Sequence, residues 1–280
     1  MSLPRFGPHD DPGPSFAALL RRTDVGGTGV GPLGSLRVEP AAAVGPVEVP
    51  HGTTCVAVRY GGGVVLAGDR RATSGHLISN HRIEKVFPAD RHSGVAIAGA
   101  AGPSAEMVRL FQLQLEHYEK VEGTPISLEG KANQLGQMVR ANLPAAMQGL
   151  VVVPIFAGFD LAADRGRLFE YDLTGGRYEE RDHVATGSGS LHADTVVKLG
   201  FRPSMARSAA INLVLDALYV ASDADSATGG PDPVRDVFPV VAVIDADGYQ
   251  RLDDAELRRR TERLLRRHRD RREGDEGSPS

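Results

Sequence analysis

One threonine in this chain lies where a single residue could supply both the nucleophile and the base of a hydrolytic reaction. Thr53 follows Gly52 at the point where a segment rich in glycine and proline gives way to a regular apolar pattern. Because glycine has no side chain, the backbone there can strain and the Thr53 hydroxyl can approach the preceding carbonyl group. Cleavage of the Gly52–Thr53 bond would free an α-amine, whose usual pKa of about 7.7 to 8.0 lets it accept the hydroxyl proton. A Gly-Thr pair before a strand is also common for purely structural reasons, so it needs support from the rest of the chain.

Other familiar chemistries find no matching motif. The nine histidines show no HExxH spacing, and the chain has neither a Walker phosphate loop nor a GxSxG elbow. One GxGxxG match, Gly29 to Gly34, contains Pro32 and follows no predicted strand, so we do not interpret it as a nucleotide site. A single cysteine, Cys55, allows neither an intrachain disulfide nor a thiolate metal cluster. We therefore expect no cofactor and no metal.

Composition and charge indicate a globular protein without an affinity for polyanions. The 280 residues are 41% hydrophobic, and the net charge is −4 with a pI near 6.1. This lack of a basic excess argues against partners such as nucleic acid or an anionic membrane. No apolar run approaches the roughly 18 residues of a membrane span, and the run from Phe16 to Leu20 is too short for a secretory signal. We expect a cytoplasmic protein.

The chain divides into three parts by composition. Residues 1–52 contain nine Gly and eight Pro, which predicts a disordered propeptide. Residues 53–255 carry the periodic patterns of one domain. Residues 256–280 form a charged, Arg-rich tail, which we interpret as a solvated helix at the end of the chain, with docking to nucleic acid or a partner as the alternative.

The predicted strands and helices occur in separate blocks along the chain. Residues 53–60 and 63–70 read as a hairpin, a strand ends at Gly99, and a helix should follow with Ser104 as its N-cap. The spacings of three and four residues in this helix predict one apolar stripe, made of Met107, Leu110, Phe111, Leu115 and Tyr118. A second helix covers 128–147, interrupted at Pro144. Further strands at 151–160, 167–180 and 239–248 surround a helical stripe at 211–218. Grouped strands and separate helical blocks favour an α+β sandwich over an alternating Rossmann arrangement.

Several longer motifs occur together in one order. They are HGTT at 51–54, AGDRRAT at 67–73, Lys85, AIAGAAG at 96–102, LEHYEK at 115–120, NLPAAMQGL at 142–150, TGSGS at 186–190 and DADSATGGPD at 223–232. From His51 to about Leu252 the chain thereby resembles the proteasome β-subunit family, specifically its actinobacterial type. The resemblance implies a four-layer αββα sandwich, the fold of the N-terminal-nucleophile hydrolases. It also implies a self-activating threonine endopeptidase.

The resemblance implies the central catalytic group. Thr53 is the nucleophile, and Asp69 pairs with Lys85, the cation beside Thr53. An ammonium close to the Thr53 amine lowers the pKa of that amine and leaves more of it able to accept a proton. Without the surrounding motifs, Asp69 and Lys85 would be interpreted as a surface salt bridge.

Four further residues are implied around Thr53. Ser188 and Asp225 correspond to residues that hydrogen-bond near its amine and hydroxyl, and Thr228 stands where the family often has serine. The hydroxyl is retained there, so we expect its role to be kept. Gly99 corresponds to the residue whose backbone N–H stabilises the oxyanion.

The implied substrate site combines backbone pairing with an apolar pocket. Thr73 and Gly99 would pair with an extended peptide as an added strand. The implied substrate-binding residues are Ala72, Thr73, Ser79, Ile83, Ile97, Gly99 and Ala101. The primary pocket residues Ala72, Ile83, Ile97 and Ala101 are uncharged, which predicts cleavage after apolar residues.

The resemblance also implies partners. These are proteasome α subunits and further β subunits in an α7β7β7α7 stack, with an ATPase ring delivering unfolded or pupylated proteins.

Two alternatives remain open at the level of the sequence. One is a different self-processing N-terminal-threonine amidase that acts on a small molecule, and the other is a non-catalytic ring subunit.

Overall fold

Two five-stranded antiparallel sheets form the centre of the molecule. The computed structural model describes residues 52–74 and 77–276, so the predicted propeptide lies outside the described residues except for Gly52. The first sheet has the order β10-β1-β2-β11-β12, made of His183–Gly187, Thr54–Tyr60, Gly63–Gly68, Val240–Asp245 and Gly248–Arg251. The second has the order β5-β6-β7-β8-β9, made of Val86–Asp90, Ser93–Gly99, Val152–Asp160, Arg165–Tyr171 and Arg177–Glu180. A separate two-stranded ribbon joins β3 (Ala72–Ser74) to β4 (Leu77–Asn80).

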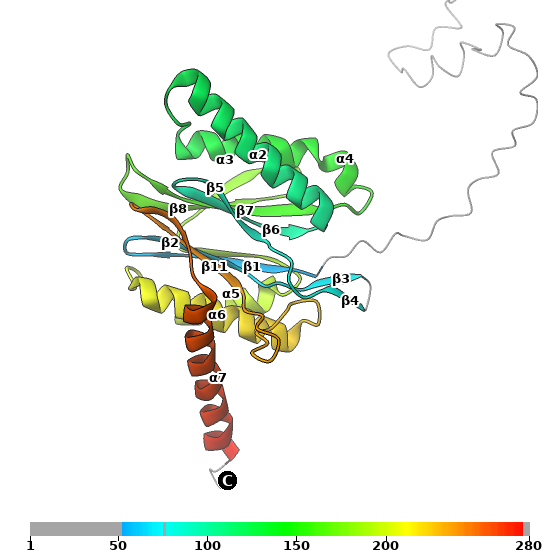
Figure 1. Ribbon diagram of the computed structural model, residues 1–280, viewed down its shortest axis with the longest axis vertical. Coiled ribbons are helices and arrows are strands. Elements are labelled where there is room, and N and C mark those ends of the chain that lie inside the picture. The colour runs from blue at the N-terminus through cyan, green and yellow to red at the C-terminus, as the bar shows by residue number, and fades with distance from the viewer. Residues whose placement is uncertain (1–51, 75–76, 277–280) are drawn as a thin grey trace, which may run out of the picture. The chain divides into compact units, whose positions relative to one another are not determined.

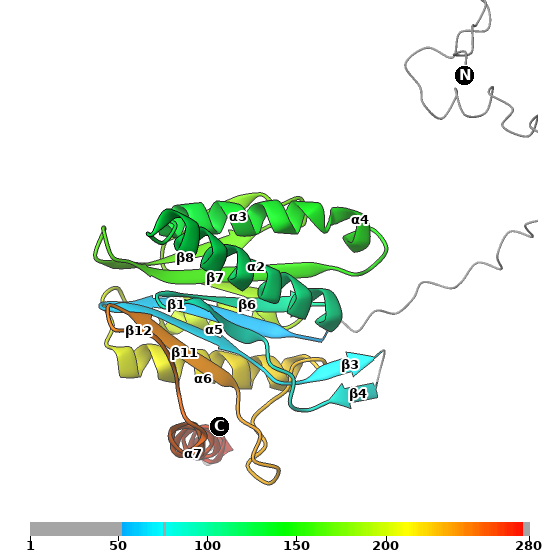
Figure 2. The ribbon, with the colours of Figure 1, turned by 45° about the horizontal axis from the view of Figure 1, so that its top comes forward.

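Helices cover the outer face of each sheet (Figures 1 and 2). The second sheet is covered by α2 (Ala101–Glu122) and α3 (Leu128–Ala141), followed by the short α4 (Leu143–Ala146). The first sheet is covered by α5 (Ser190–Gly200) and α6 (Arg207–Ala224), and α7 (Asp254–Glu276) packs on α6. The predicted four-layer αββα sandwich is therefore confirmed.

The alternation of side chains along β1 explains why the sheets are buried on both faces. Val56 and Val58 pack toward the α5 and α6 layer, whereas Cys55 and Ala57 pack against the other sheet. Successive side chains of a strand point to opposite faces. Each sheet therefore contributes to one helix–sheet core and to the core between the sheets.

The start of α2 differs from the prediction, because Ser104 is not the N-cap. The N-cap is Ala100, and the helix begins at Ala101 directly after the strand that ends at Gly99. Pro103 fits in the first turn because the N–H groups of that turn have no partner within the helix. Ser104 is buried in the same turn, and its N–H donates to the carbonyl of Ala100.

The predicted helical stripes are buried only in part, and Met147, at the end of the second predicted helix, is exposed. In α2, Phe111 and Leu115 are buried as expected, but Leu110 and Tyr118 of the predicted stripe are exposed. The buried stripe is narrower than the pattern suggested. The break predicted at Pro144 is confirmed, since α3 ends at Ala141 and the proline lies in the first turn of α4.

The arginine-rich end of the chain is helical and is attached to the domain along one face. Leu257 and Leu264 of α7 are buried in the cluster beneath α6, while Arg259 and Arg263 are exposed. The predicted boundary between residues 255 and 256 therefore falls inside α7. The helix is solvated on its arginine face only.

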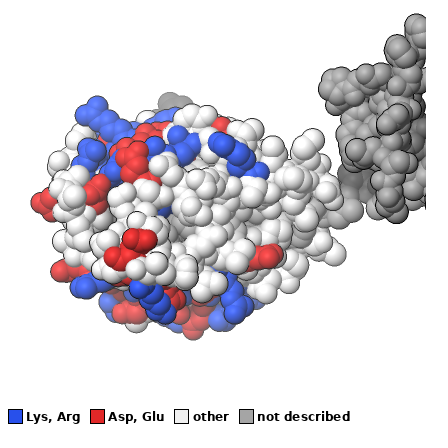
Figure 3. Space-filling model, turned by 90° about the horizontal axis from the view of Figure 1, so that it is seen from above, with Lys and Arg blue, Asp and Glu red and all other residues white. Residues whose placement is uncertain are grey.

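Charge is distributed in both signs over the face seen in Figure 3. Lysine and arginine side chains alternate with aspartate and glutamate near the margin, and a broad area between them carries neither. This face offers no continuous basic surface for nucleic acid. Within residues 52–74 and 77–276, none of the helices combines the length and apolarity needed to cross a membrane.

Candidate active site

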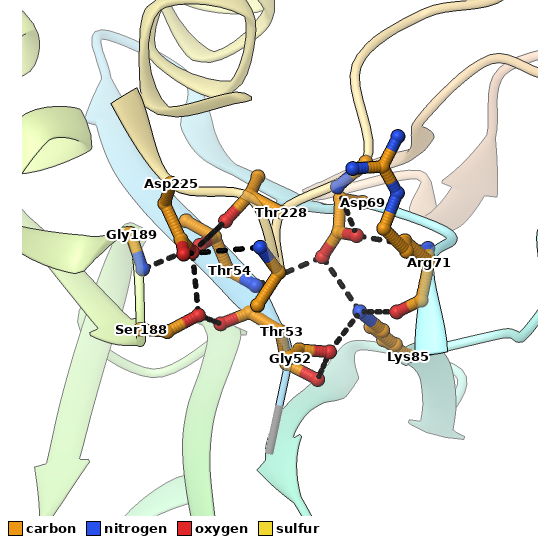
Figure 4. Close-up of polar contacts among 12 residues, drawn as sticks. Gly52, Thr53, Thr54, Asp69, Arg71, Lys85, Ser188, Gly189, Asp225 and Thr228 are labelled. Carbon is orange, nitrogen blue, oxygen red and sulfur yellow. Dashed lines mark hydrogen bonds and ion pairs between the residues drawn. The ribbon is translucent and has the colours of Figure 1, made fainter. Parts of the chain in front are cut away.

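Thr53 lies directly before β1, at the edge where the two sheets face each other. Its side chain is buried, and its Oγ1 donates a hydrogen bond to the carbonyl oxygen of Gly52 at 2.6 Å. The backbone carbonyl of Thr53 is itself held by the N–H of Ser188 at 2.9 Å. Figure 4 shows Gly52 and Thr53 together with the polar groups that surround them.

Lys85 lies directly before β5 and is only 4% exposed. Its Nζ donates to Asp69 Oδ1 at 2.7 Å and to the carbonyl oxygen of Arg71 at 2.6 Å. A third hydrogen bond, 3.1 Å long, reaches the carbonyl oxygen of Gly52. An ammonium has three N–H donors, so each one has an acceptor and the group is fixed in place. Lys85 Nζ and Thr53 Oγ1 thus meet at the same oxygen.

The Asp69 carboxylate holds Lys85 and is held in turn by three backbone N–H groups. It is fully buried, and besides Lys85 it accepts from the N–H of Thr54 at 2.8 Å, Arg71 at 2.9 Å and Gly229 at 2.8 Å. A buried carboxylate is stable only when its charge is paired and its oxygens are hydrogen-bonded. Asp69 and Lys85 therefore form a buried, fully hydrogen-bonded ion pair and not a surface salt bridge.

On the other side of Thr53, Asp225 accepts hydrogen bonds from two hydroxyl groups. Ser188 Oγ and Thr228 Oγ1 each donate to Asp225 Oδ2 at 2.6 Å. Burial raises the pKa of this carboxyl. Hydrogen bonds from Ser188, Thr228 and the Ala227 N–H, together with nearby His192, lower the pKa by more, so that it lies below its usual value. Asp225 is therefore an ionised acceptor at neutral pH.

A cavity of about 340 Å³ opens beside Thr53. Its lining includes Thr53 and Lys85 together with six of the seven residues that the sequence assigned to substrate binding, namely Ala72, Thr73, Ile83, Ile97, Gly99 and Ala101. Ser79 is the exception, because it does not line the cavity. Its hydroxyl donates to the carbonyl oxygen of Ala72 at 3.2 Å, so Ser79 contacts a lining residue and not the cavity itself.

Four lining residues were absent from the sequence prediction: Glu84, Phe87, Ser104 and Ala105. Phe87 follows Ile83 and Lys85 at spacings of two, which is the spacing of side chains on one face of an extended chain. Ala105 follows Ala101 by four residues, one turn along α2. Periodicity alone could therefore have added these two residues to the pocket.

Gly99 ends β6 at the rim of the cavity with a φ of 118°. A Cβ atom there would overlap the carbonyl oxygen of Val151 on the neighbouring strand. Side chains rarely adopt this backbone conformation, so both the φ and the close approach require glycine. The absence of a side chain also leaves the backbone open to the cavity.

Cys55 lies close to this group but is not a competing nucleophile. Burial raises the pKa of its thiol to about 12, against a smaller lowering effect of Lys85. The thiolate is the reactive form of cysteine, so the neutral thiol is inert. Among the described residues, no group of three or more His, Cys, Asp or Glu side chains is arranged to hold a metal ion.

Comparison with known proteins gives one family. A family model for proteasome subunits matches residues 49–234. The proteasome subunit beta of Acidimicrobium ferrooxidans is 58% identical over 259 residues, covering 92% of this chain and 91% of the relative. The proteasome subunits beta of Streptomyces griseus and Acidothermus cellulolyticus are also 58% identical, over 212 and 222 residues. These alignments cover 76% and 78% of this chain, and 75% and 77% of the relatives.

The region that the family model matches contains the strands β1 to β10, the helices α2 to α6 and every residue of the site described above, whereas β11 and β12 lie beyond it. The extent and identity of these matches agree with the motifs that pointed to the same family in the sequence. The chain belongs to the proteasome subunit family, and the relatives it resembles there are beta subunits.

Proposed function

We propose that this chain is a threonine-type endopeptidase of a proteasome core, activated by self-cleavage between Gly52 and Thr53. One observation carries the proposal: the carbonyl oxygen of Gly52 accepts hydrogen bonds from Thr53 Oγ1 at 2.6 Å and from Lys85 Nζ at 3.1 Å. The attacking hydroxyl and the cation that polarises the carbonyl thus converge on the bond to be cut. Such fixed donors stabilise the negative charge that develops on an attacked carbonyl.

Self-cleavage proceeds through an ester. Thr53 Oγ1 attacks the carbonyl carbon of Gly52, the C–N bond breaks, and the hydroxyl proton ends on the Thr53 nitrogen. Water then hydrolyses the ester, which releases the Gly52 carboxylate and restores the Thr53 hydroxyl. The product carries a free α-amine on Thr53.

The mature site repeats the attack on a substrate peptide. The α-amine accepts the proton of Thr53 Oγ1 as the oxygen attacks, and it donates that proton to the leaving amine as the C–N bond breaks. Water then hydrolyses the resulting ester, which releases the new carboxyl end of the substrate and restores the Thr53 hydroxyl. The N–H of Gly99 is the proposed oxyanion donor, because Gly99 lines the cavity at the end of β6. Ionised Asp225, with Ser188 and Thr228, orients the amine.

The cavity supports a preference for apolar residues before the cleaved bond. The apolar side chains of Ala72, Ile83, Phe87, Ile97 and Ala101 line its wall. Burial of an apolar side chain there is favourable, whereas a charged one would lose its hydration. Thr73 and Gly99 are the proposed strand partners of the peptide backbone.

The family implies assembly with other subunits into a proteasome core. We propose stacked rings of the type α7β7β7α7 in the cytoplasm, with an ATPase ring that delivers unfolded or pupylated proteins. Exposed apolar side chains of α2, Leu110, Leu113 and Val121, are available for contacts between subunits.

The proposal is tested by intact mass of the full-length chain co-expressed with the α subunit encoded in the same genome. We expect the assembled particle to contain a chain that has lost residues 1–52. An inhibitor that reacts with N-terminal threonine should add one mass increment to the peptide that begins at Thr53. A full-length chain in a particle that hydrolyses peptides would overturn the assignment, and activity on small amides alone would indicate an amidase.

Gly52→Ala is expected to slow self-cleavage by about 100-fold, because displacements of about 1 Å cost this much in rate. A Cβ atom at this position would lie 2.5 Å from Thr73 Oγ1 and 2.7 Å from the carbonyl oxygen of Ala227, so the scissile carbonyl must shift. The measurement is the fraction of cleaved chain against time after assembly. Gly102→Ala is the control, since nothing lies within 4 Å of a Cβ there. Equal rates for both variants would contradict the steric argument.

A further inference from the structure

Thr54, the residue after the nucleophile, contacts both halves of the site. Its side chain is fully buried. Its backbone N–H donates to Asp69 Oδ1 at 2.8 Å, on the side of Lys85. Its Oγ1 lies 2.6 Å from Thr228 Oγ1, on the side of Asp225 (Figure 4). The structure therefore connects the two charged groups of the site through this one residue.

The directions of the hydrogen bonds follow from the number of protons available. Ionised Asp225 can only accept, so the single hydroxyl proton of Thr228 goes to Asp225 Oδ2. Thr228 Oγ1 must then accept from Thr54, whose own proton is used in that bond. Thr54 Oγ1 accepts in turn from the N–H of Gly189 at 3.0 Å. The chain runs from Gly189 through Thr54 and Thr228 to Asp225, and each hydroxyl proton in it has an acceptor.

Gly189 shows that the fold makes room for these two hydroxyl groups. A Cβ atom on Gly189 would lie 2.5 Å from Thr54 Oγ1 and 2.6 Å from Thr228 Oγ1. Any side chain at this position would displace one of the hydroxyl groups. The tight fit indicates that the pair is held in one arrangement, since a Thr hydroxyl otherwise rotates between staggered positions.

We propose that Thr54 is a positioning residue, whose hydroxyl holds Thr228 and Asp225 in place beside Thr53 and whose backbone connects them to the Asp69–Lys85 pair. The inference rests on the proposed function, because it assigns Thr54 a part in the same reaction. Thr54 does not touch the substrate in this role. It acts through Thr228 and Asp225, and Asp225 also accepts from Ser188, whose N–H and hydroxyl both donate to the carbonyl oxygen of Thr53.

Thr54→Val removes the hydroxyl and keeps the branched shape of the side chain. It leaves the Gly189 N–H without its acceptor and Thr228 without its donor. We expect kcat per titrated active site to fall about 10- to 100-fold with KM within about twofold, since an unsatisfied buried group costs enough to change a rate by this factor. Thr54→Ser keeps the hydroxyl and should restore kcat to within about threefold.

The experiment uses the full-length chain co-expressed with its α subunit, with active sites counted by a covalent N-terminal-threonine inhibitor. Thr261→Val in α7 is the matched control, because Thr261 is equally buried and its hydroxyl has no partner within the described part of the chain. It should leave kcat unchanged. The double variant Thr54→Val/Thr228→Val should be no slower than Thr228→Val alone, because both changes break one chain of hydrogen bonds.

Three results would overturn the inference: a kcat for Thr54→Val within twofold of the unmodified chain, no recovery with serine, or multiplicative losses in the double variant. If Thr54→Val does not assemble, Thr54→Cys replaces it as a weaker donor, and a kcat equal to that of the unmodified chain rejects the role. In each case the unmodified chain still cleaves at Thr53, so the proposed function stands. Conversely, an unmodified chain that never cleaves at Gly52–Thr53 rejects the proposed function itself.

Discussion

Thr53→Ala is expected to give a full-length chain in assembled particles that have no peptidase activity. The change removes the hydroxyl that lies 2.6 Å from the Gly52 carbonyl oxygen and leaves the Lys85 contact with that oxygen in place. Self-cleavage therefore stops for lack of a nucleophile, and no free α-amine forms. For the peptidase reaction we expect a loss of at least about 10⁴-fold, the scale seen when a catalytic nucleophile is removed.

The measurement combines intact mass with hydrolysis of a fluorogenic peptide that has an apolar residue before the cleaved bond. Thr53→Ser is the control, because it retains a hydroxyl at the same position and should still be cleaved. A Thr53→Ala chain that turns over peptide at the normal rate would show that the nucleophile lies elsewhere. A Thr53→Ser chain as inactive as Thr53→Ala, though assembled, would show that more than the hydroxyl is needed.

Much of the fold could be predicted because its signals are local. The hairpin β1–β2 follows from period-two alternation on either side of Gly61 and Gly62. Such alternation predicts half-buried strands, but both faces of these strands are buried because a sheet covers one face and helices cover the other. The break at Pro144 follows from the missing N–H of proline. The short ribbon β3–β4 carries no such alternation, and its strand β4 is exposed throughout, so the sequence pattern gave no sign of it.

The errors occurred where tertiary contacts override a local preference. Ser104 has the side chain of a good N-cap, but the N–H of Ala100 is bonded to Val151 on the neighbouring strand and the helix starts at once. Leu110 and Tyr118 fit an apolar stripe by spacing, yet both side chains are exposed in the folded chain. Spacing along one helix does not reveal which of its apolar residues the rest of the domain covers.

Sequence motifs predicted the site residues that lie within them, but they assigned no role to Thr54. Its hydroxyl meets Thr228, which is 174 residues away in the sequence. No periodicity relates a strand and a loop at that separation, and a threonine in a strand is ordinary by propensity. Only the folded arrangement, in which the start of β1 meets the loop after α6, brings the two hydroxyl groups together.

Lys85→Met is the second change with a large expected effect, since it removes the buried ammonium and keeps the unbranched shape of the side chain. Asp69 keeps three backbone donors but loses its counter-charge, and breaking a buried pair in this way costs about 3–5 kcal/mol of stability. The Gly52 carbonyl also loses the cation that polarises it. We expect self-cleavage to slow by at least about 100-fold, as on removal of one oxyanion donor.

The chain offers a matched control that separates stability from chemistry. Lys131 on α3 is also buried, and it forms an ion pair with Asp90 far from Thr53 in the fold. Lys131→Met should lower the melting temperature by a similar amount, yet particles that assemble should cleave the Gly52–Thr53 bond at the normal rate. If both variants lost cleavage equally in assembled particles, the effect of Lys85 would be explained by stability alone. If only Lys85→Met loses it, the ammonium acts on the scissile carbonyl, as the shared oxygen of Gly52 implies.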